Sequence, residues 1–397
     1  MYTHIRRCYT GSIFEKSLRI YLNMKGNYAA WDTPQLTPKQ FHERSAHEKL
    51  IYLSTLGTLA PNTHNSQPWR FALTPEKNEI EVYADHAAIL PASDVRGRQA
   101  AISIGCAIEN MVIAAEYLGY TAHPAAHTVD TKDMQPRGKK SAAHRYIHLS
   151  TIKYTKNTLR TVASADKKRF MSIWTRKVTR AEYDPHTPIP KKIGRELEAA
   201  ASDNKVKLHT ITDPVRRRAL AELQAQADGF VINSPKFSKE LGAWMLPNDT
   251  NACLGMPGIG FGLQDKQAQR IHRGLLEQEP LEPEDGLRFA IAGKLGMETA
   301  PLIGLITISK DEVADWMRAG RTLQNILLTL ESEGISAAIH AGLAEVGLVN
   351  KMLAVMIGTR RKIAVIFRAG WAHNPEHRTR PHSPRRPIEE VIITPRT

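Results

Sequence analysis

The sequence predicts an α+β fold, because strand-like and helix-like periodicities follow one another along the chain. Residues 70–73 and 79–83 alternate apolar and polar side chains around a turn-forming run, which predicts a β-hairpin. Between residues 104 and 118 apolar side chains recur at intervals of three and four, which predicts an amphipathic helix ending at Gly119. An edge strand is expected at 145–153, further strands at 301–308 and 362–367, and further helices from Pro38 onward and at 167–174, 190–201, 214–227 and 345–356.

The first amphipathic helix has a second copy later in the chain. Residues 108–119 align without gaps on residues 323–334, at a constant offset of 215 residues. The coinciding residues are Asn110 and Asn325, Glu116 and Glu331, Gly119 and Gly334, with Gly105 and Gly320 in the same phase upstream. One amphipathic helix can resemble another by chance, so an internal repeat is a hypothesis at this point.

Length and composition indicate a globular protein larger than one ordinary domain. The 397 residues and 42% hydrophobic content suffice for substantial cores, so two domains or a tandem pair are expected. No apolar run reaches the roughly 18 residues that a membrane-spanning helix needs, so no membrane partner is expected. Three scattered cysteines and a polar N-terminus favour a cytoplasmic protein without disulfides, metal site or secretory signal.

The chain is strongly basic, which bears on its partners. Lys plus Arg is 54 and Asp plus Glu is 40, a net charge of +14, with much of the excess in residues 132–180 and after Gly358. Such a balance favours nucleic acid, an acidic membrane surface or an anionic cofactor as partner. Zinc-finger, helix-turn-helix and RNP signatures are missing, so nucleic acid is not the expected partner, although a basic nucleic-acid-binding module is kept as an alternative.

One loop carries the clearest chemical signal in the chain. Residues 61–69 read Pro-Asn-Thr-His-Asn-Ser-Gln-Pro-Trp: two prolines that restrict the backbone, small polar side chains between them, and a large aromatic before a strand. A rigid polar loop of this kind suits a flat polar ligand, and an ordinary turn is the alternative. The spelling Asn-x-Gln-Pro-Trp after Ala-Pro resembles the flavin-contacting loop of the FMN-dependent nitroreductase family, most closely its Acg-like branch.

Two basic elements extend this resemblance. The run Arg176–Arg180, with Tyr183 downstream, resembles the family's Arg-x-Ser/Thr-x-Arg/Lys arm, although Val178 stands where the family has a hydroxyl. Arg385 and Arg386 before Pro387 resemble the basic pair near the family's C-terminus. Solvated surface clusters are the alternative interpretation of both elements.

The resemblance implies an intrachain pseudo-dimer with a nitroreductase-like fold, in which a central antiparallel or mixed sheet is flanked by helices. In the classical family one subunit supplies the Asn-x-Gln-Pro-Trp loop and its partner supplies the arm and the C-terminal cations. Here the loop falls in the first half and the other elements fall in the second, which implies one flavin site. The expected parts are a leader at 1–37, a first half at 38–155, and a second half at 156–397 with a Gly-rich lid at 234–265.

The resemblance also implies which residues bind FMN. His340 follows the second helix copy, where the family contacts the flavin N5 atom, and is expected to offer its backbone N–H. Arg98 opens a helix and is a weaker candidate for the phosphate or ring. His64 is expected to face solvent. The other expected ligands are Asn62, Thr63 and Asn65 at the ring or ribityl chain, and Arg176, Arg180 and Arg385 at the phosphate.

The implied function is an FMN oxidoreductase that passes hydride from NAD(P)H through FMN to a small-molecule acceptor such as a nitroaromatic or quinone. The flavin performs this chemistry, so no catalytic side chain and no metal are expected. The alternative is a flavin-sequestering protein in which the lid covers FMN and little reductase activity is left. A homodimer of the whole chain is left open.

Overall fold

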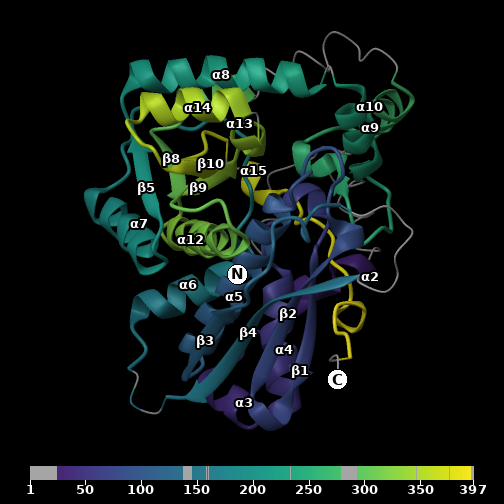
Figure 1. The fold of residues 1–397 in the computed structure, drawn as a ribbon, viewed down its shortest axis with the longest axis vertical. Helices are drawn as coiled ribbons and strands as arrows, with labels where there is room; N and C mark the ends of the chain where they lie inside the picture. Colours follow the sequence, from purple (N-terminus) through teal and green to yellow (C-terminus); the bar gives the residue numbers. More distant parts are fainter. Residues whose placement is uncertain are drawn as a thin grey trace, which may run out of the picture.

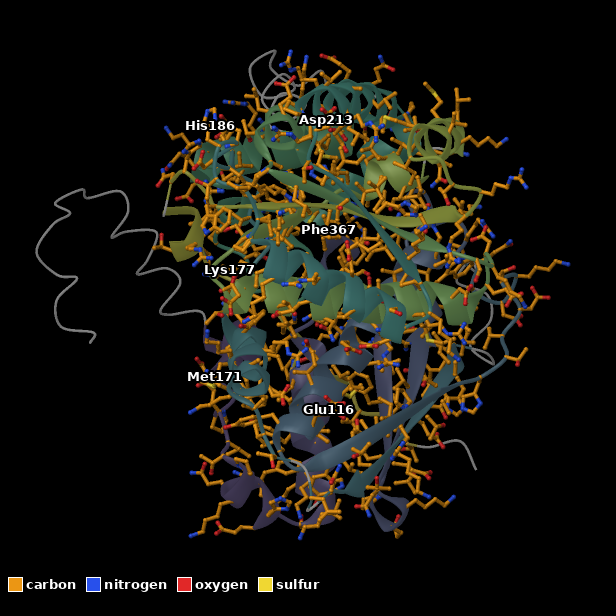
Figure 2. The ribbon with its side chains drawn as sticks, turned by 90° about the vertical axis from the view of Figure 1, so that its left-hand side faces the viewer. Glu116, Met171, Lys177, His186, Asp213 and Phe367 are labelled. Carbon is orange, nitrogen blue, oxygen red and sulfur yellow. The ribbon has the colours of Figure 1, made fainter. Side chains whose placement is uncertain are left out.

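The structure is a computed structural model that describes residues 25–136, 145–157, 159, 161–232, 234–278, 293–345, 347–374 and 376–394. Helices surround two four-stranded antiparallel sheets, so the α+β class is confirmed. The two sheets lie on opposite sides of a central pair of long helices, α5 (Arg98–Tyr117) and α12 (Val313–Ser332) (Figure 1). In the side view, Phe367 of the second sheet lies above Glu116, which is near the end of α5 (Figure 2).

The first sheet contains the predicted hairpin. Its strands are β1 (Trp69–Thr74), β2 (Glu79–Asp85), β3 (Tyr120–Ala126) and β4 (Tyr146–Lys156), in the order β1-β2-β4-β3. The prediction of an edge strand at 145–153 was wrong, because β4 pairs with β2 on one side and β3 on the other. Ahead of the sheet, helices α3 (Pro38–His42) and α4 (Ala46–Thr58) each begin with a capping box, formed by Thr37 with Gln40 and by Ser45 with Glu48.

The second sheet repeats the topology of the first. Its strands are β5 (Lys207–Ile211), β8 (Leu302–Ile308), β9 (Ser336–Ile339) and β10 (Lys362–Gly370), in the order β5-β8-β10-β9. In each half a long helix follows the second strand, α5 in the first and α12 in the second. The remaining helices here are α6 (Ser164–Thr175), α7 (Lys191–Asp203), α13 (Ala341–Glu345) and α14 (Gly347–Met356).

Helices α5 and α12 cross at the two glycines of the repeat. A Cβ atom on Gly105 would lie 2.2 Å from the carbonyl oxygen of Met317, and one on Gly320 would lie 1.9 Å from that of Ile102. Met317 is the counterpart of Ile102 at the offset of 215 residues, so the two contacts are equivalent. Such reciprocal contacts are the mark of a two-fold interface. The chain therefore has the predicted internal duplication.

Polar contacts beside the crossing also join residues that are related by the offset of 215. Gln324 donates to Asn110 at 2.6 Å, and Asn325 donates to Glu109 at 2.9 Å. Gln324 is the counterpart of Glu109, and Asn325 that of Asn110. Arg321 adds an ion pair to Glu109 at 2.9 Å. These hydrogen bonds and this ion pair connect the two helices across the pseudo-two-fold axis, which favours a single helix register, although Gln324 Oε1 is buried without a partner within the described residues.

A long insertion separates β5 from β8. The equivalent β1–β2 connection is only the short turn that contains η4 (Pro75–Lys77). The insertion holds α8 (Pro214–Ile232), α9 (Pro235–Trp244), β6 (Met245–Leu246), β7 (Met256–Pro257), η7 (Gly258–Phe261) and α10 (Asp265–Glu277). The lid predicted at 234–265 lies inside it, and a small apolar core of its own joins α9 to α10.

Both ends of the described chain pack on the first half. The tail leaves the second half through α15 (Glu376–Thr379), and Ile393 donates its N–H to Phe71 of β1 at 2.8 Å (Figure 1). Trp31, in η2 (Ala29–Asp32) after α2 (Lys25–Tyr28), stacks on His382 with ring centroids 3.8 Å apart. Of the leader expected at 1–37, residues 25–37 therefore pack against the rest of the chain, and residues 1–24 lie outside the described part.

In the described part of the chain, α5 alone is long and apolar enough to cross a membrane. However, 89% of its apolar window is buried inside the protein, against α12 and the neighbouring helices. Burial of this kind is typical of a core helix, which passes the same test of length and composition. The cytoplasmic location stays a prediction.

Candidate functional site

The Pro61–Trp69 loop has an unusual backbone. His64, Asn65 and Gln67 have φ values of 52°, 55° and 49°, in the left-handed region that residues other than glycine seldom adopt. The Asn62 side chain accepts from the Gln67 N–H at 2.8 Å and closes the loop on itself. A conformation of this kind costs free energy, so surrounding contacts must maintain it.

Those contacts come from two segments distant in sequence. Asn65 Nδ2 donates to Gly255 and Pro384 carbonyls, both at 2.9 Å, and Gln67 Nε2 donates to the Cys253 carbonyl at 2.7 Å. The Arg386 N–H donates to Gln67 Oε1 at 3.0 Å. The amides of Asn65 and Gln67 therefore join the loop to the insertion and to the C-terminal tail.

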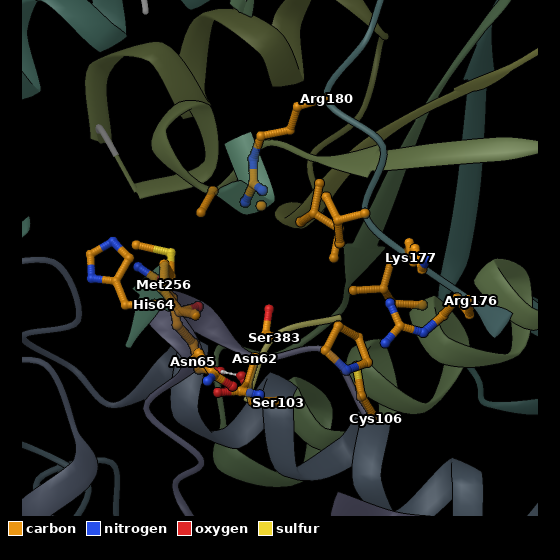
Figure 3. A pocket seen from close by; sticks show the side chains of 18 of the residues that line it. Asn62, His64, Asn65, Ser103, Cys106, Arg176, Lys177, Arg180, Met256 and Ser383 are labelled. Carbon is orange, nitrogen blue, oxygen red and sulfur yellow. Dashed lines mark hydrogen bonds between the residues drawn. The ribbon is translucent and has the colours of Figure 1, made fainter. Parts of the chain in front are cut away.

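A cavity of about 300 Å³ lies where these segments meet, between the two halves. Its wall combines the loop, α5, the run 176–180, the insertion, the end of β9 and the tail (Figure 3). Arg180 points into the cavity from the side opposite Asn62, Asn65 and Ser103 (Figure 3). Of the eight residues expected to bind FMN, seven line this cavity: Asn62, Thr63, Asn65, Arg176, Arg180, His340 and Arg385.

Arg98 is the expected ligand that does not line the cavity. Its guanidinium pairs with Glu345 at 2.8 Å and donates to the Ala344 carbonyl at 2.7 Å. The first free amides of α5 are also engaged, because the Asp94 carboxylate accepts from Gln99 and Ala100 at 3.0 and 2.8 Å. The expectation of an anion site at this helix start was wrong.

The cavity wall carries a strong excess of positive charge. Glu345 is the one carboxylate among the lining residues, and Arg98 already neutralises it. Burial lowers the pKa of Arg176 to about 10. Burial together with repulsion from neighbouring guanidiniums lowers the pKa of Arg180 to about 10 and that of Arg385 to about 9. Buried charges without counter-charge are costly, so an anionic ligand would stabilise this wall. The cations lining the cavity are Arg176, Lys177, Arg180, Arg380 and Arg385.

Two of these cations are already occupied by backbone carbonyls. Arg385 donates to Thr58 at 2.6 Å, to Ala60 at 3.0 Å and to the Asn65 side chain at 2.8 Å. Lys177 donates to the carbonyls of Arg378 and Arg380. Both side chains therefore hold the tail against the rest of the cavity wall, and this favours a supporting role for Arg385 over the expected phosphate contact.

Arg176 and Arg180 keep donors available. Arg176 Nη2 donates to the Leu59 carbonyl at 3.1 Å, but its Nε atom is buried without a hydrogen-bond partner. Arg180 stands over the Phe261 ring at 4.5 Å, and no hydrogen bond from it is found within the described residues. Arg180 keeps accessible surface although protein surrounds it, because it faces the cavity.

His340 is held in place by three contacts. Its backbone N–H donates to Ile366 at 2.9 Å, so the expectation that this N–H is offered to a ligand was wrong. Arg368 Nε donates to His340 Nε2 at 3.1 Å, which leaves Nδ1 to donate to Gln224 Oε1 at 3.1 Å. Burial and the nearby arginines lower its pKa well below 6.5, so the ring is neutral.

His64 faces the cavity, which corrects the expectation that it faces solvent. Burial lowers its pKa from 6.5 to about 4. Unfolding therefore takes up a proton between these values, so stability falls as the pH falls through this window. We expect the unfolding free energy of the apoprotein to drop by about 2 kcal/mol more between pH 7 and 5 than that of the His64→Gln variant. Equal pH slopes in urea titrations of the two proteins would contradict this.

Sequence reasoning missed Ser103 and Cys106 of α5, which form the wall next to the loop. The counterparts of these small side chains in α12 are Arg318 and Arg321. Arg318 pairs with Asp315, and Arg321 pairs with Glu109. The alignment of the two helix copies could have identified these positions, because it matches a small residue in α5 with an arginine in α12 at each of them.

No protein-family model matches the chain. "Putative NAD(P)H nitroreductase acg" of Mycobacterium tuberculosis is 23% identical over 337 residues, which cover 85% of this chain and 93% of that protein. "Putative NAD(P)H nitroreductase Rv3131" of the same organism is 25% identical over 348 residues, 86% of this chain and 90% of that protein.

The resemblance to the Acg-like branch of the nitroreductases is confirmed. Solved structures similar to this Acg-like chain include the FMN-dependent nitroreductase NfnB of Mycobacterium smegmatis in complex with NADPH. It is 15% identical with a TM-score of 0.38, over 58% of this chain and 99% of that one. A structure described as "a putative nitroreductase" from Anabaena variabilis has a TM-score of 0.38 at 11% identity, over 74% of this chain and 69% of that one.

Proposed function

We propose that this Acg-like chain is an FMN-dependent NAD(P)H oxidoreductase that binds its flavin in the cavity between the two halves. The observation that carries the proposal is the cavity wall itself, with five cations and a single, already paired carboxylate. Its volume of about 300 Å³ lies at the lower end of the usual range for ligand sites. The names of the relatives, which refer to NAD(P)H-dependent nitroreduction, support the same conclusion.

The residues present fit a flavin phosphate at the Arg176 end of the cavity. Arg176 has a buried, unpartnered Nε donor there, and Lys177 and Arg385 add positive charge next to it. Charge-assisted hydrogen bonds from a guanidinium are the usual means of holding a phosphate. Thr63 has a side-chain hydroxyl at the cavity for a polar part of the cofactor. When bound, FMN supplies a ring that accepts hydride from NAD(P)H and passes electrons to an acceptor.

We propose one flavin per chain, with 38–155 and 156–397 as the two halves. In α5, Ser103 and Cys106 leave room beside the loop, whereas Arg318 and Arg321 occupy the equivalent face of α12. The second half also has no copy of the Asn-x-Gln-Pro-Trp sequence. A pseudo-two-fold axis relates the two halves and would otherwise generate a second site. The differences between the halves therefore indicate that one site of an originally symmetric pair has been lost.

The insertion supports flavin sequestration as a second candidate function. Met256 and Phe261 form part of the cavity wall. The Glu240 carboxylate of α9 accepts from the Ala92 N–H at 2.7 Å and from the Ser93 N–H at 2.9 Å, so the insertion is tied to the first half. An insertion held in this position limits the access of a nicotinamide or of a nitroaromatic or quinone acceptor.

The absorption spectrum of the purified protein tests both functions. We expect flavin bands at a ratio near one FMN per chain, and bleaching when NADPH is added without oxygen. Bands that persist with NADPH and bleach with dithionite would favour sequestration. A colourless protein that does not take up added FMN would refute both functions, and a ratio near two would refute the single site.

A further inference from the structure

Exposed apolar side chains gather on one face of the molecule. Six large hydrophobic residues are exposed in the described part of the chain, and four of them belong to α8 and α14. Val215 of α8 is 72% exposed, and Leu348, Met352 and Val355 of α14 are 71%, 49% and 81% exposed. The α14 residues are spaced by four and three, so they share one side of that helix. Such a concentration indicates an interaction surface.

The two helices cover the same side of the second sheet. Leu220 and Ala221 of α8 and Val349 and Leu353 of α14 belong to one apolar core with strands β8 and β10. Figure 1 shows both helices at the top of the molecule, on the far side of this sheet from α12. Each helix therefore buries one side in the core and presents the other outward. The exposed part of this surface is called the α8–α14 face below.

The α8–α14 face is also basic. Exposed cations flank the apolar residues, Arg216 and Arg218 on α8 and Lys351 and Arg360 on or just after α14. The nearby carboxylate of Asp213 accepts from the Arg216 N–H at 2.9 Å, as a cap at the start of α8. Apolar side chains surrounded by Lys and Arg match a surface whose outer layer is anionic and whose interior is apolar.

We propose that the α8–α14 face docks this protein peripherally on an anionic membrane surface. A second copy of the chain is disfavoured, because a two-fold contact would bring like charges together. The inference does not depend on the proposed function. It departs from the expectation of no membrane partner, which rested on the lack of an apolar run long enough to span a membrane.

Vesicle sedimentation with the full-length protein tests the proposal. We expect binding to vesicles of phosphatidylcholine with about one third phosphatidylglycerol, little binding to phosphatidylcholine alone, and release at about 0.5 M salt. The double variant Leu348→Gln/Val355→Gln should bind the anionic vesicles at least about tenfold more weakly, because each apolar side chain it removes would enter the lipid interface. The double variant Arg216→Gln/Lys351→Gln should also bind the anionic vesicles more weakly, because it removes two positive charges from the face.

Matched controls use residues outside the face. Val95→Gln changes an exposed apolar side chain, and Arg195→Gln removes an exposed charge of α7, so both should bind as the wild type does. Surface substitutions of this kind are expected to leave the fold intact, which circular dichroism checks. Equal binding to neutral and anionic vesicles would overturn the proposal. So would unchanged binding by the face variants, or face variants that abolish self-association of the protein instead.

Discussion

Gly320→Ala is expected to lower the free energy of unfolding strongly. The added Cβ atom would lie 1.9 Å from the Ile102 carbonyl oxygen, inside the backbone of the facing helix. A backbone atom cannot rotate away as a side chain can, so α5 and α12 would have to separate. This separation would also break the contacts of Glu109 and Asn110 with α12. We expect a loss of at least about 3 kcal/mol of unfolding free energy.

Urea denaturation followed by circular dichroism measures this loss. The matched control is Gly194→Ala, within α7, where an added Cβ atom meets nothing within 4 Å. There the substitution should stabilise the protein by up to about 1 kcal/mol, because alanine favours helix more than glycine does. Gly105→Ala should behave as Gly320→Ala does, since its Cβ would lie 2.2 Å from the Met317 carbonyl oxygen. A soluble Gly320→Ala variant with wild-type stability would contradict the close crossing of the two helices.

Arg176→Gln is expected to weaken FMN binding roughly 10- to 100-fold, while riboflavin binding changes little. The reason is that the Arg176 guanidinium is buried and keeps one unpartnered nitrogen, while the carboxylate that interacts with it, Glu331, does not line the cavity. A hydrogen bond between charged groups contributes about 1.5–3 kcal/mol, and 1.4 kcal/mol is a factor of ten in affinity. Riboflavin lacks the phosphate, so it would not lose this interaction.

Titration of flavin fluorescence with apoprotein measures both affinities. Arg195→Gln serves as control, because it removes the same charge from an exposed position on α7. Arg176 also donates to the Leu59 carbonyl, so the thermal stability of the variant must be compared with the wild type. Equal losses for FMN and riboflavin would mean that Arg176 supports the cavity wall and does not bind the phosphate.

Local elements and the duplication could be predicted from the sequence. The hairpin at 69–85 was predicted within a few residues, and the second helix copy at 323–334 overlaps α12, which begins earlier, at Val313. Periodicity and turn residues act over short distances along the chain, so they are readable without tertiary information. The offset of 215 residues also identified the two glycines that meet at the helix crossing.

The different roles of the candidate ligands could not be predicted from the sequence and depend on long-range packing. Arg385 and Arg176 look alike in sequence, but one has its donors taken by the carbonyls that end α4 and the other keeps a donor free. The backbone of His340 belongs to a strand contact, and His64 is turned inward by a left-handed backbone. Each outcome depends on which carbonyl or side chain lies within about 3 Å of the residue in question. These partners come from distant parts of the sequence, so only the folded chain brings them together.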